Sequence, residues 1–125
     1  MSHRYKDLIV WQRARVLADE VYRASEVFPK KEVYGLTSQI RRAAVSVVSN
    51  IAEGQGRLTR GEFLQFLGHS RGSLFELETQ LTIAADLNYF RPEKLASLEE
   101  KTSEVKRLLN GLIDSLRTKD VPVCG

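Results

Sequence analysis

The chain has 125 residues, of which 42% are hydrophobic and 28% are charged. This length allows one compact core but not a catalytic domain beside a separate substrate domain. No apolar run approaches the roughly 20 residues that a membrane-spanning helix needs, and the N-terminus lacks the apolar stretch of a secretory signal. The single cysteine, Cys124, fits a reducing compartment. Composition therefore predicts one cytoplasmic domain over residues 1–118 and a flexible tail over residues 119–125.

Charge is unevenly distributed along the chain, although the net charge is only +3. Residues 1–60 contain 11 Lys or Arg and 6 Asp or Glu, whereas residues 61–125 contain 8 and 10. An ordinary solvated surface can show such a difference, and so can a surface that binds nucleic acid. Both interpretations remain open at this stage, and the basic half is the N-terminal one.

Two amphipathic helices are predicted in the first half, over Leu8–Val27 and Val33–Glu53. Apolar residues recur there at alternating spacings of three and four, which places them on one helix face. Asp7 is the expected N-cap of the first helix, and Pro29 is expected to end it. Gly54 is expected to end the second helix in a left-handed conformation. The expected core positions are Val10, Ala14, Leu17, Val21, Ala24 and Phe28 in the first helix and Leu36, Ile40, Ala43, Val47 and Ile51 in the second.

A third helix is predicted over Arg60–Asn88. Thr59 and Glu62 have the spacing of a capping box, in which each side chain satisfies a free backbone donor of the other residue. Gly68 and Gly72 lie inside this helix, where each costs roughly 1 kcal/mol relative to alanine. We expect tight packing against a neighbouring helix to be the reason for both glycines. The expected core positions are Phe63, Leu67, Ser70, Leu74, Leu77, Leu81 and Ala84.

The fourth helix is predicted from Pro92, which suits the first helical turn, to about Arg117. Four helices joined by short connections predict an all-α protein with an antiparallel up-down-up-down four-helix bundle. Its expected core positions are Leu95, Leu98, Thr102, Val105, Leu109, Leu112 and Leu116. Further apolar residues lie off the four core stripes and predict a second buried face between subunits: Trp11, Tyr22, Val48, Phe66, Leu108 and Ile113.

The segment SNIAEGQGRLTRGEF, residues 49–63, raises the question of a phosphate-binding loop. A dinucleotide-binding loop follows a strand, and a P-loop requires Gly-Lys-Ser or Gly-Lys-Thr, so neither is predicted. Gly54 and Gly56 instead follow a helix C-terminus, whose negative dipole repels phosphate. The segment therefore predicts a corner between two helices, with Arg57 near the negative helix end and Arg60 available to an external anion.

The segments RYKDLIVWQRA, YGLTSQIRRAAVSVVSNIAEGQGR, EFLQFLGHSRGSLFELETQL and ADLNYF resemble the proteins encoded in intervening sequences of bacterial 23S ribosomal RNA genes. The resemblance covers about residues 5 to 90, and Val48 stands where a proline is expected. It implies an antiparallel four-helix bundle that assembles into a ring, commonly a pentamer, without established catalytic activity. In a related branch, the accessory proteins of diversity-generating retroelements, a basic ring engages nucleic acid and a reverse transcriptase.

A polar stripe accompanies the apolar stripe of the second helix, and it consists of Gln39, Arg42, Ser46, Asn50 and Glu53. One interpretation is structural: the stripe supplies hydrogen bonds and an Arg42 to Glu53 network between helices or subunits, with partners such as Glu76 or Glu78. The other is functional: it lines a groove or ring opening that binds a polar ligand.

Seven arginines are the candidate contacts to nucleic acid: Arg13, Arg15, Arg23, Arg41, Arg57, Arg60 and Arg71. Arg41 and Arg57 lie about 24 Å apart along a helix, so one chain cannot gather them into one pocket. A ring of subunits would repeat each charge, and several weak phosphate contacts would then add.

The sequence offers little for catalysis or metal binding. Neither His3 nor His69 has a glutamate three positions before it, which the di-iron bundles require. His69 is expected to be a partly buried structural residue, and no nucleophile has a recognisable activating partner. We expect no metal, no cofactor and no enzymatic activity.

The expected function is that of a homo-oligomeric binding module without enzymatic activity, with structured RNA or, less directly, DNA as the ligand. The alternative is an oligomeric scaffold for a protein partner such as a reverse transcriptase or a ribosome-associated factor. A membrane partner is not expected.

Overall fold

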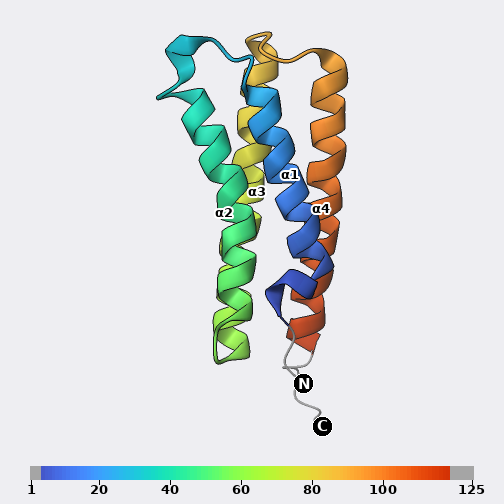
Figure 1. The fold of residues 1–125 in the computed structure, drawn as a ribbon. Coiled ribbons are helices and arrows are strands. Elements are labelled where there is room, and N and C mark those ends of the chain that lie inside the picture. Colours follow the sequence, from blue (N-terminus) through green and yellow to red (C-terminus); the bar gives the residue numbers. More distant parts are fainter. Residues whose placement is uncertain (1–3, 119–125) are drawn as a thin grey trace.

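The computed structural model describes residues 4–118, which form an all-α fold (Figure 1). The predicted tail over residues 119–125, with Cys124, and the residue His3 lie outside this range. Within it the prediction of four helices is confirmed, and no strand occurs. The elements are the 3-10 helix η1 (Tyr5–Asp7), α1 (Ile9–Ser25), the 3-10 helix η2 (Lys30–Glu32), α2 (Leu36–Gln55), α3 (Arg60–Asp86) and α4 (Pro92–Thr118).

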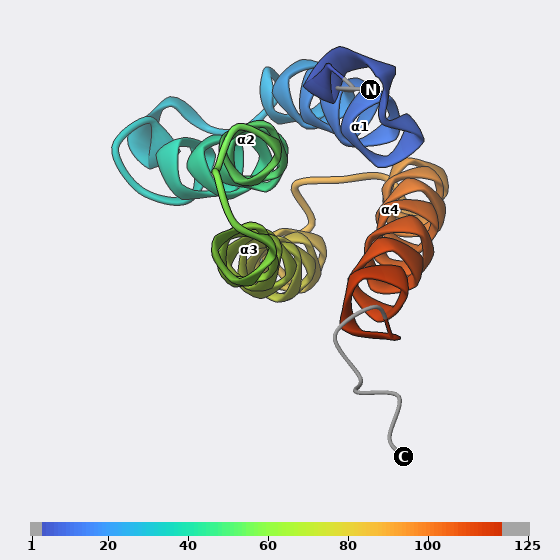
Figure 2. The ribbon, with the colours of Figure 1, turned by 90° about the horizontal axis from the view of Figure 1, so that it is seen from below.

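The four helices form one bundle around a shared core. The α1–α2 and α3–α4 connections lie at one end of the bundle, at the top of Figure 1, and the α2–α3 connection lies at the other. Seen from below in Figure 2, the helices follow one another around the core, and α4 closes against α1. Each helix therefore packs against two others.

The core is built from the apolar stripes that the sequence predicts. Every expected core position of α1, with Phe28 beyond its end, is buried. In α4 the buried row shifts near the C-terminus, where Ile113 is buried and Leu112 and Leu116 are only partly so. A strict three-and-four spacing drifts around a helix with 3.6 residues per turn, which explains the shift. Ile113 thus belongs to this chain's own core, and its prediction as a subunit contact is wrong.

The two polar residues of the predicted core rows, Ser70 and Thr102, are satisfied by backbone carbonyls. Ser70 is fully buried and its hydroxyl donates to the carbonyl of Val47 at 2.8 Å, across the α2–α3 contact. Thr102 is buried in α4 and donates to the carbonyl of Leu98 at 2.7 Å. Hydroxyls bonded in this way can be buried without an unpaired donor.

The predicted caps at Asp7 and Gly54 are wrong, and the predicted cap at Thr59 is confirmed. Asp7 belongs to η1, so α1 begins after Leu8 without a side-chain cap. Gly54 is helical and lacks a positive φ, since α2 continues to Gln55. At the start of α3, the Thr59 hydroxyl accepts a hydrogen bond from the backbone N–H of Glu62 at 3.1 Å, which is one half of a capping box, and it donates to the Glu62 carboxylate at 3.2 Å.

The end of α3 is a Schellman motif around Asn88. The Asn88 N–H donates to the carbonyl of Ala85, and the Tyr89 N–H donates to the carbonyl of Ala84, both at 2.9 Å. Asn88 has a φ of 61°, which asparagine tolerates better than most residues. The predicted helix over Arg60–Asn88 therefore ends two residues early, at Asp86.

Within the chain, the close approach of two helices occurs at a glycine other than Gly68 and Gly72. A Cβ atom at Gly68 or Gly72 would have no described atom outside the helix backbone within 4 Å, so neither serves tight packing within the chain. A Cβ at Gly54 would lie 2.9 Å from the Phe63 ring and 3.0 Å from the Cβ of Phe66. The close approach of two helices therefore occurs at Gly54, between α2 and α3.

Candidate nucleic-acid interface

The three candidate arginines of α1 are exposed, and each contacts a neighbouring side chain. The Nε atom of Arg13 lies 3.6 Å from a carboxylate oxygen of Glu104 on α4. Arg15 lies over the ring of Trp11, with 5.7 Å between guanidinium carbon and ring centroid. Exposed pairs of this kind contribute little stability and open readily to another anion.

Arg41 ties the start of α2 to the end of α1. Its Nε donates to the hydroxyl of Ser25 at 2.7 Å, and its terminal nitrogen donates to the carbonyl of Tyr22 at 3.1 Å. The guanidinium also lies 4.7 Å from the Tyr22 ring centroid. These contacts use much of the fixed donor geometry of the side chain, so Arg41 is part of the joint between helices.

Arg57 and Arg60 lie at the opposite end of the bundle, around the α2–α3 corner. Arg57 donates to Glu53 at 3.1 Å, one helical turn away, and packs over the ring of Phe66 at 4.3 Å. Arg60 is the first residue of α3, is exposed, and also makes an interaction within the chain. The predicted corner is confirmed, since Gly56 is the C-cap of α2 and Thr59 the N-cap of α3, although Gly54 is still helical.

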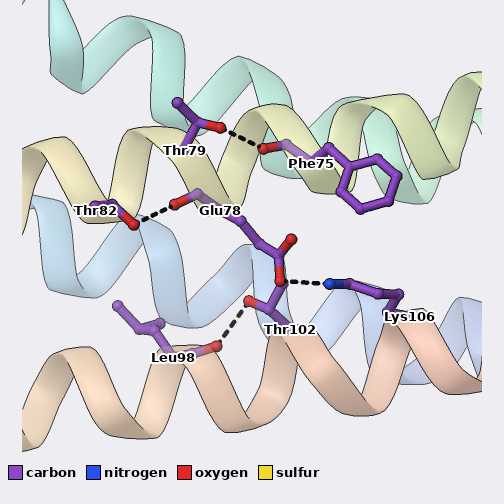
Figure 3. Close-up of polar contacts among 7 residues, drawn as sticks. All are labelled: Phe75, Glu78, Thr79, Thr82, Leu98, Thr102 and Lys106. Carbon is purple, nitrogen blue, oxygen red and sulfur yellow. Dashed lines mark hydrogen bonds and ion pairs between the residues drawn. The ribbon is translucent and has the colours of Figure 1, made fainter.

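Arg71 belongs to the contact between α3 and α4, where it donates to the amide oxygen of Asn110 at 3.2 Å. Further along the same contact, Lys106 pairs with Glu78 at 2.7 Å and lies 5.2 Å from the Phe75 ring centroid. Figure 3 shows this ion pair, with Phe75 on the same helix as Glu78. Both cations therefore hold α3 and α4 together.

The seven predicted arginines do not gather on one surface of the single chain. They lie on α1, at the α1–α2 joint, at the α2–α3 corner and along the α3–α4 contact. Sequence reasoning missed Arg91 and Lys94, which line a cleft with Arg23 at the opposite end from the α2–α3 corner. Their signal in the sequence was weak, because Arg23 and Arg91 are far apart in the chain.

The polar stripe of α2 is divided between structural and exposed residues. Ser46 and Ser73 share a hydrogen bond at 2.8 Å between α2 and α3. The Asn50 amide donates to the carbonyl of Ser46 at 2.8 Å and to its hydroxyl at 3.0 Å. This middle part of the stripe fits the structural interpretation.

Arg42 and Glu53 do not contact each other within the described part of one chain, and their predicted network between subunits stays a prediction. Glu53 pairs with Arg57 instead, and eleven residues along a helix separate its Cα from that of Arg42 by about 16 Å. Gln39 and Arg42 are exposed and line a cleft of about 430 Å³ together with Glu76. Glu78, the other predicted partner, is bound to Lys106.

The carboxylate of Glu32, which the sequence did not single out, links the α1–α2 and α3–α4 connections. Glu32 of η2 accepts the backbone N–H of Leu36 at 3.0 Å, and its second oxygen accepts the hydroxyl of Tyr89 at 2.7 Å. The bond from Leu36, followed by the bond from Tyr89, lowers the pKa of Glu32. The same carboxylate raises the pKa of Tyr89. Glu32 thus caps α2 and fixes the α3–α4 connection.

His69 is exposed, not partly buried as expected, and its ring makes an edge-to-face contact with Phe66, with 5.8 Å between the ring centroids. Residues 4–118 contain no group of three or more His, Cys, Asp or Glu side chains placed to hold a metal ion. Among the described helices, none is both long and apolar enough to cross a membrane.

Comparison with known proteins identifies the family of this chain. A crystal structure of a protein of unknown function from Bacteroides thetaiotaomicron, of the S23 ribosomal protein family, has a TM-score of 0.79 at 22% identity. The match covers 87% of this chain and 98% of the other, and it shows a shared fold. No curated protein matches the sequence. The family model described as 23S rRNA-intervening sequence protein matches residues 6–111, and the chain therefore belongs to this family.

Proposed function

We propose that this chain is a cytoplasmic, non-enzymatic module, an antiparallel bundle that forms a homo-oligomeric ring, commonly of five copies, and binds structured RNA. The observation that carries the proposal is the outer face of α3 over residues 65–75, whose exposed positions carry no charge, although exposed Glu76 follows directly. Its exposed positions from Gln65 to Phe75 are Gln65, Gly68, His69, Gly72 and Phe75.

A helix face of this composition supports self-association. Solvated faces of bundle helices normally carry charged and polar residues, so exposed positions without charge are suited to contact another surface. Bare glycines let a second helix approach closely, and Phe75, with 52% of its surface exposed, supplies apolar area beside them. A second copy of the chain is therefore the proposed cover of this face.

RNA binding is supported by the family and by cations that remain free. The family description refers to an intervening sequence of 23S ribosomal RNA. Several basic side chains make no hydrogen bond or ion pair within residues 4–118, among them Lys30, Lys31, Arg42, Arg91 and Lys94. A ring would repeat each of them, so that contacts too weak to bind singly act together.

The test is fluorescence anisotropy of the purified chain with a labelled structured RNA and a DNA duplex, repeated from about 50 to 200 mM salt, where phosphate contacts weaken steeply. We expect saturable binding to RNA that declines steeply with salt. Absence of binding at the lowest salt would contradict the proposal.

A scaffold for a protein partner, such as a reverse transcriptase or a ribosome-associated factor, is the second candidate function. Two large apolar side chains favour it, since Tyr34 is 95% exposed and Leu58 is 98% exposed. They lie at opposite ends of α2. If the ring forms but binds no RNA, the scaffold becomes the preferred function.

A further inference from the structure

A cleft of about 560 Å³ lies at the end of the bundle where α1 ends and α4 begins, which is the top of Figure 1. We call it the α1/α4 cleft. One side comes from the end of α1 and the chain that follows, with Arg23, Val27 and Pro29. The other comes from the α3–α4 connection and the first turn of α4, with residues 88–91 and Lys94.

The charged groups in the lining of the α1/α4 cleft are all cations. They are Arg23, Arg91 and Lys94, and no carboxylate lines the cleft. The side chains of Arg91 and Lys94 make no hydrogen bond or ion pair with the described part of the chain. Arg23 has one exposed partner, Glu20, at 3.5 Å, and such pairs are weak. Three like charges around one cleft favour an anionic occupant.

The walls of the α1/α4 cleft also offer a fixed apolar surface. Tyr89 and Phe90 line it, and Phe28 behind them lies 5.2 Å and 5.1 Å from their ring centroids. The hydroxyl of Tyr89 is held by Glu32. Val27 adds a largely exposed apolar side chain, with 74% of its surface accessible. The rings are therefore positioned before any ligand arrives, which lowers the entropic cost of stacking.

Asn88 contributes a polar group at the same cleft. Its backbone is fixed by the Schellman motif at the end of α3, with a φ of 61°. Its side-chain amide makes no hydrogen bond within residues 4–118. A carboxamide both donates and accepts, as recognition of a base edge requires.

We propose that the α1/α4 cleft binds one unpaired nucleotide unit of an RNA strand. The phosphate lies between Arg91, Lys94 and Arg23, and the base lies against the apolar wall formed by Val27 and Phe90. This inference rests on the proposed function and deepens it, because it assigns the contact to an unpaired loop or end of the structured RNA. Only in such segments is a base free to leave its stack and contact an aromatic side chain.

The test compares two kinds of variant with a matched control in the full chain. Arg91→Gln with Lys94→Gln removes two free cations, and Val27→Glu places a carboxylate against the wall. The control, Arg107→Gln with Arg117→Gln, makes the same charge change at two exposed positions of α4 outside the cleft. All these side chains are exposed, and circular dichroism melting checks that each variant folds.

The probes are a labelled unpaired RNA, followed by anisotropy, and adenosine monophosphate, adenosine and inorganic phosphate, followed by calorimetry. We expect adenosine monophosphate to bind more tightly than adenosine or phosphate alone, because only it fills both parts of the cleft. The double glutamine variant and Val27→Glu should each weaken binding of the unpaired RNA and of the nucleotide about tenfold, the scale of one lost phosphate or stacking contact. The control should change both affinities much less.

The outcomes separate this proposal from the function on which it rests. If the wild-type chain binds structured RNA and the cleft variants bind it as the control does, the cleft proposal is overturned and the proposed function stands. If phosphate binds as tightly as the nucleotide, the base contact is wrong and the proposal is overturned. Binding of the nucleotide without any RNA binding also overturns it, and absence of all binding overturns both.

Discussion

The outer faces of α3 and α4 differ, although the two helices have the same length of 27 residues and lie side by side. The middle of α4 exposes Glu99, Glu100, Ser103 and Arg107, as expected for a helix face in water. The corresponding part of α3 exposes glycines, a glutamine, a histidine and a phenylalanine. The same fold therefore presents one helix for solvent and one whose outer face is suited to contact another helix.

The inner and outer faces of α3 are compared most directly at Leu74 and Phe75, which are neighbours in sequence. Leu74 is fully buried, and Leu74→Ala should lower the free energy of unfolding by about 3 kcal/mol, the usual cost of a core cavity. Phe75→Ala should cost the isolated chain less than about 1 kcal/mol, because it loses mainly the contact with Lys106. Urea unfolding at low protein concentration measures both values, and equal costs would contradict the division between the faces.

Gly54 tests the close approach of α2 and α3. Gly54→Ala should destabilise the chain by about 2 kcal/mol, because the new Cβ meets the ring and the carbonyl of Phe63 and the Cβ of Phe66. Thermal and urea unfolding of the purified variant give the value. An increase in stability would mean that the helices are not in contact at this residue.

Substitution of Gly72 by alanine should change the stability of the isolated chain in the opposite direction. Gly72→Ala should stabilise a monomer by about 1 kcal/mol, because alanine has the higher helix propensity and meets no atom of the chain. Gly111→Ala on α4 is the matched control, since Gly111 is equally open. In a self-associating protein we expect Gly72→Ala to weaken the assembly and Gly111→Ala to leave it unchanged. Identical behaviour of the two variants would argue against a contact on α3.

The smallest expected effect on stability concerns Glu32, which lies on neither α3 nor α4. Because its pKa is lowered in the folded state, its contribution to stability is present above the ordinary value of 4.5 and is lost as pH falls through the folded pKa. Glu32→Gln should therefore reduce the loss of stability below pH 4.5, as measured by urea unfolding at a series of pH values. Glu26→Gln, at an exposed carboxylate without a bond in residues 4–118, is the control. An unchanged pH dependence in Glu32→Gln would contradict the capping role.

The four helices and most of their core could be predicted because each apolar row follows the helical period. The outward direction of Gly68 and Gly72 was also accessible, since both lie opposite the row containing Leu67 and Leu74. Tight packing at these glycines does not occur within one chain, so a neighbouring helix could only come from another copy. The position of each glycine relative to the core row was the better guide.

The candidate site was less predictable, because it depends on which distant segments meet. Nothing in the local sequence indicates that Glu32 bonds both Leu36 and Tyr89, since one partner is 57 residues away. Arginine counts likewise could not separate Arg41, which is fixed between helices, from Arg91, whose side chain has no partner among the described residues. Side-chain geometry decides which cations remain available to a ligand.

Sedimentation velocity of three proteins tests the central claim, that the outer face of α3 joins copies of this chain. The proteins are the wild type, Gly72→Glu and the control Gly111→Glu, which adds the same charge to α4. The account predicts that the wild type and Gly111→Glu sediment as one oligomer, and that Gly72→Glu sediments as a folded monomer of about 14.2 kDa. A monomeric wild type, or a Gly72→Glu oligomer of unchanged size, would contradict it.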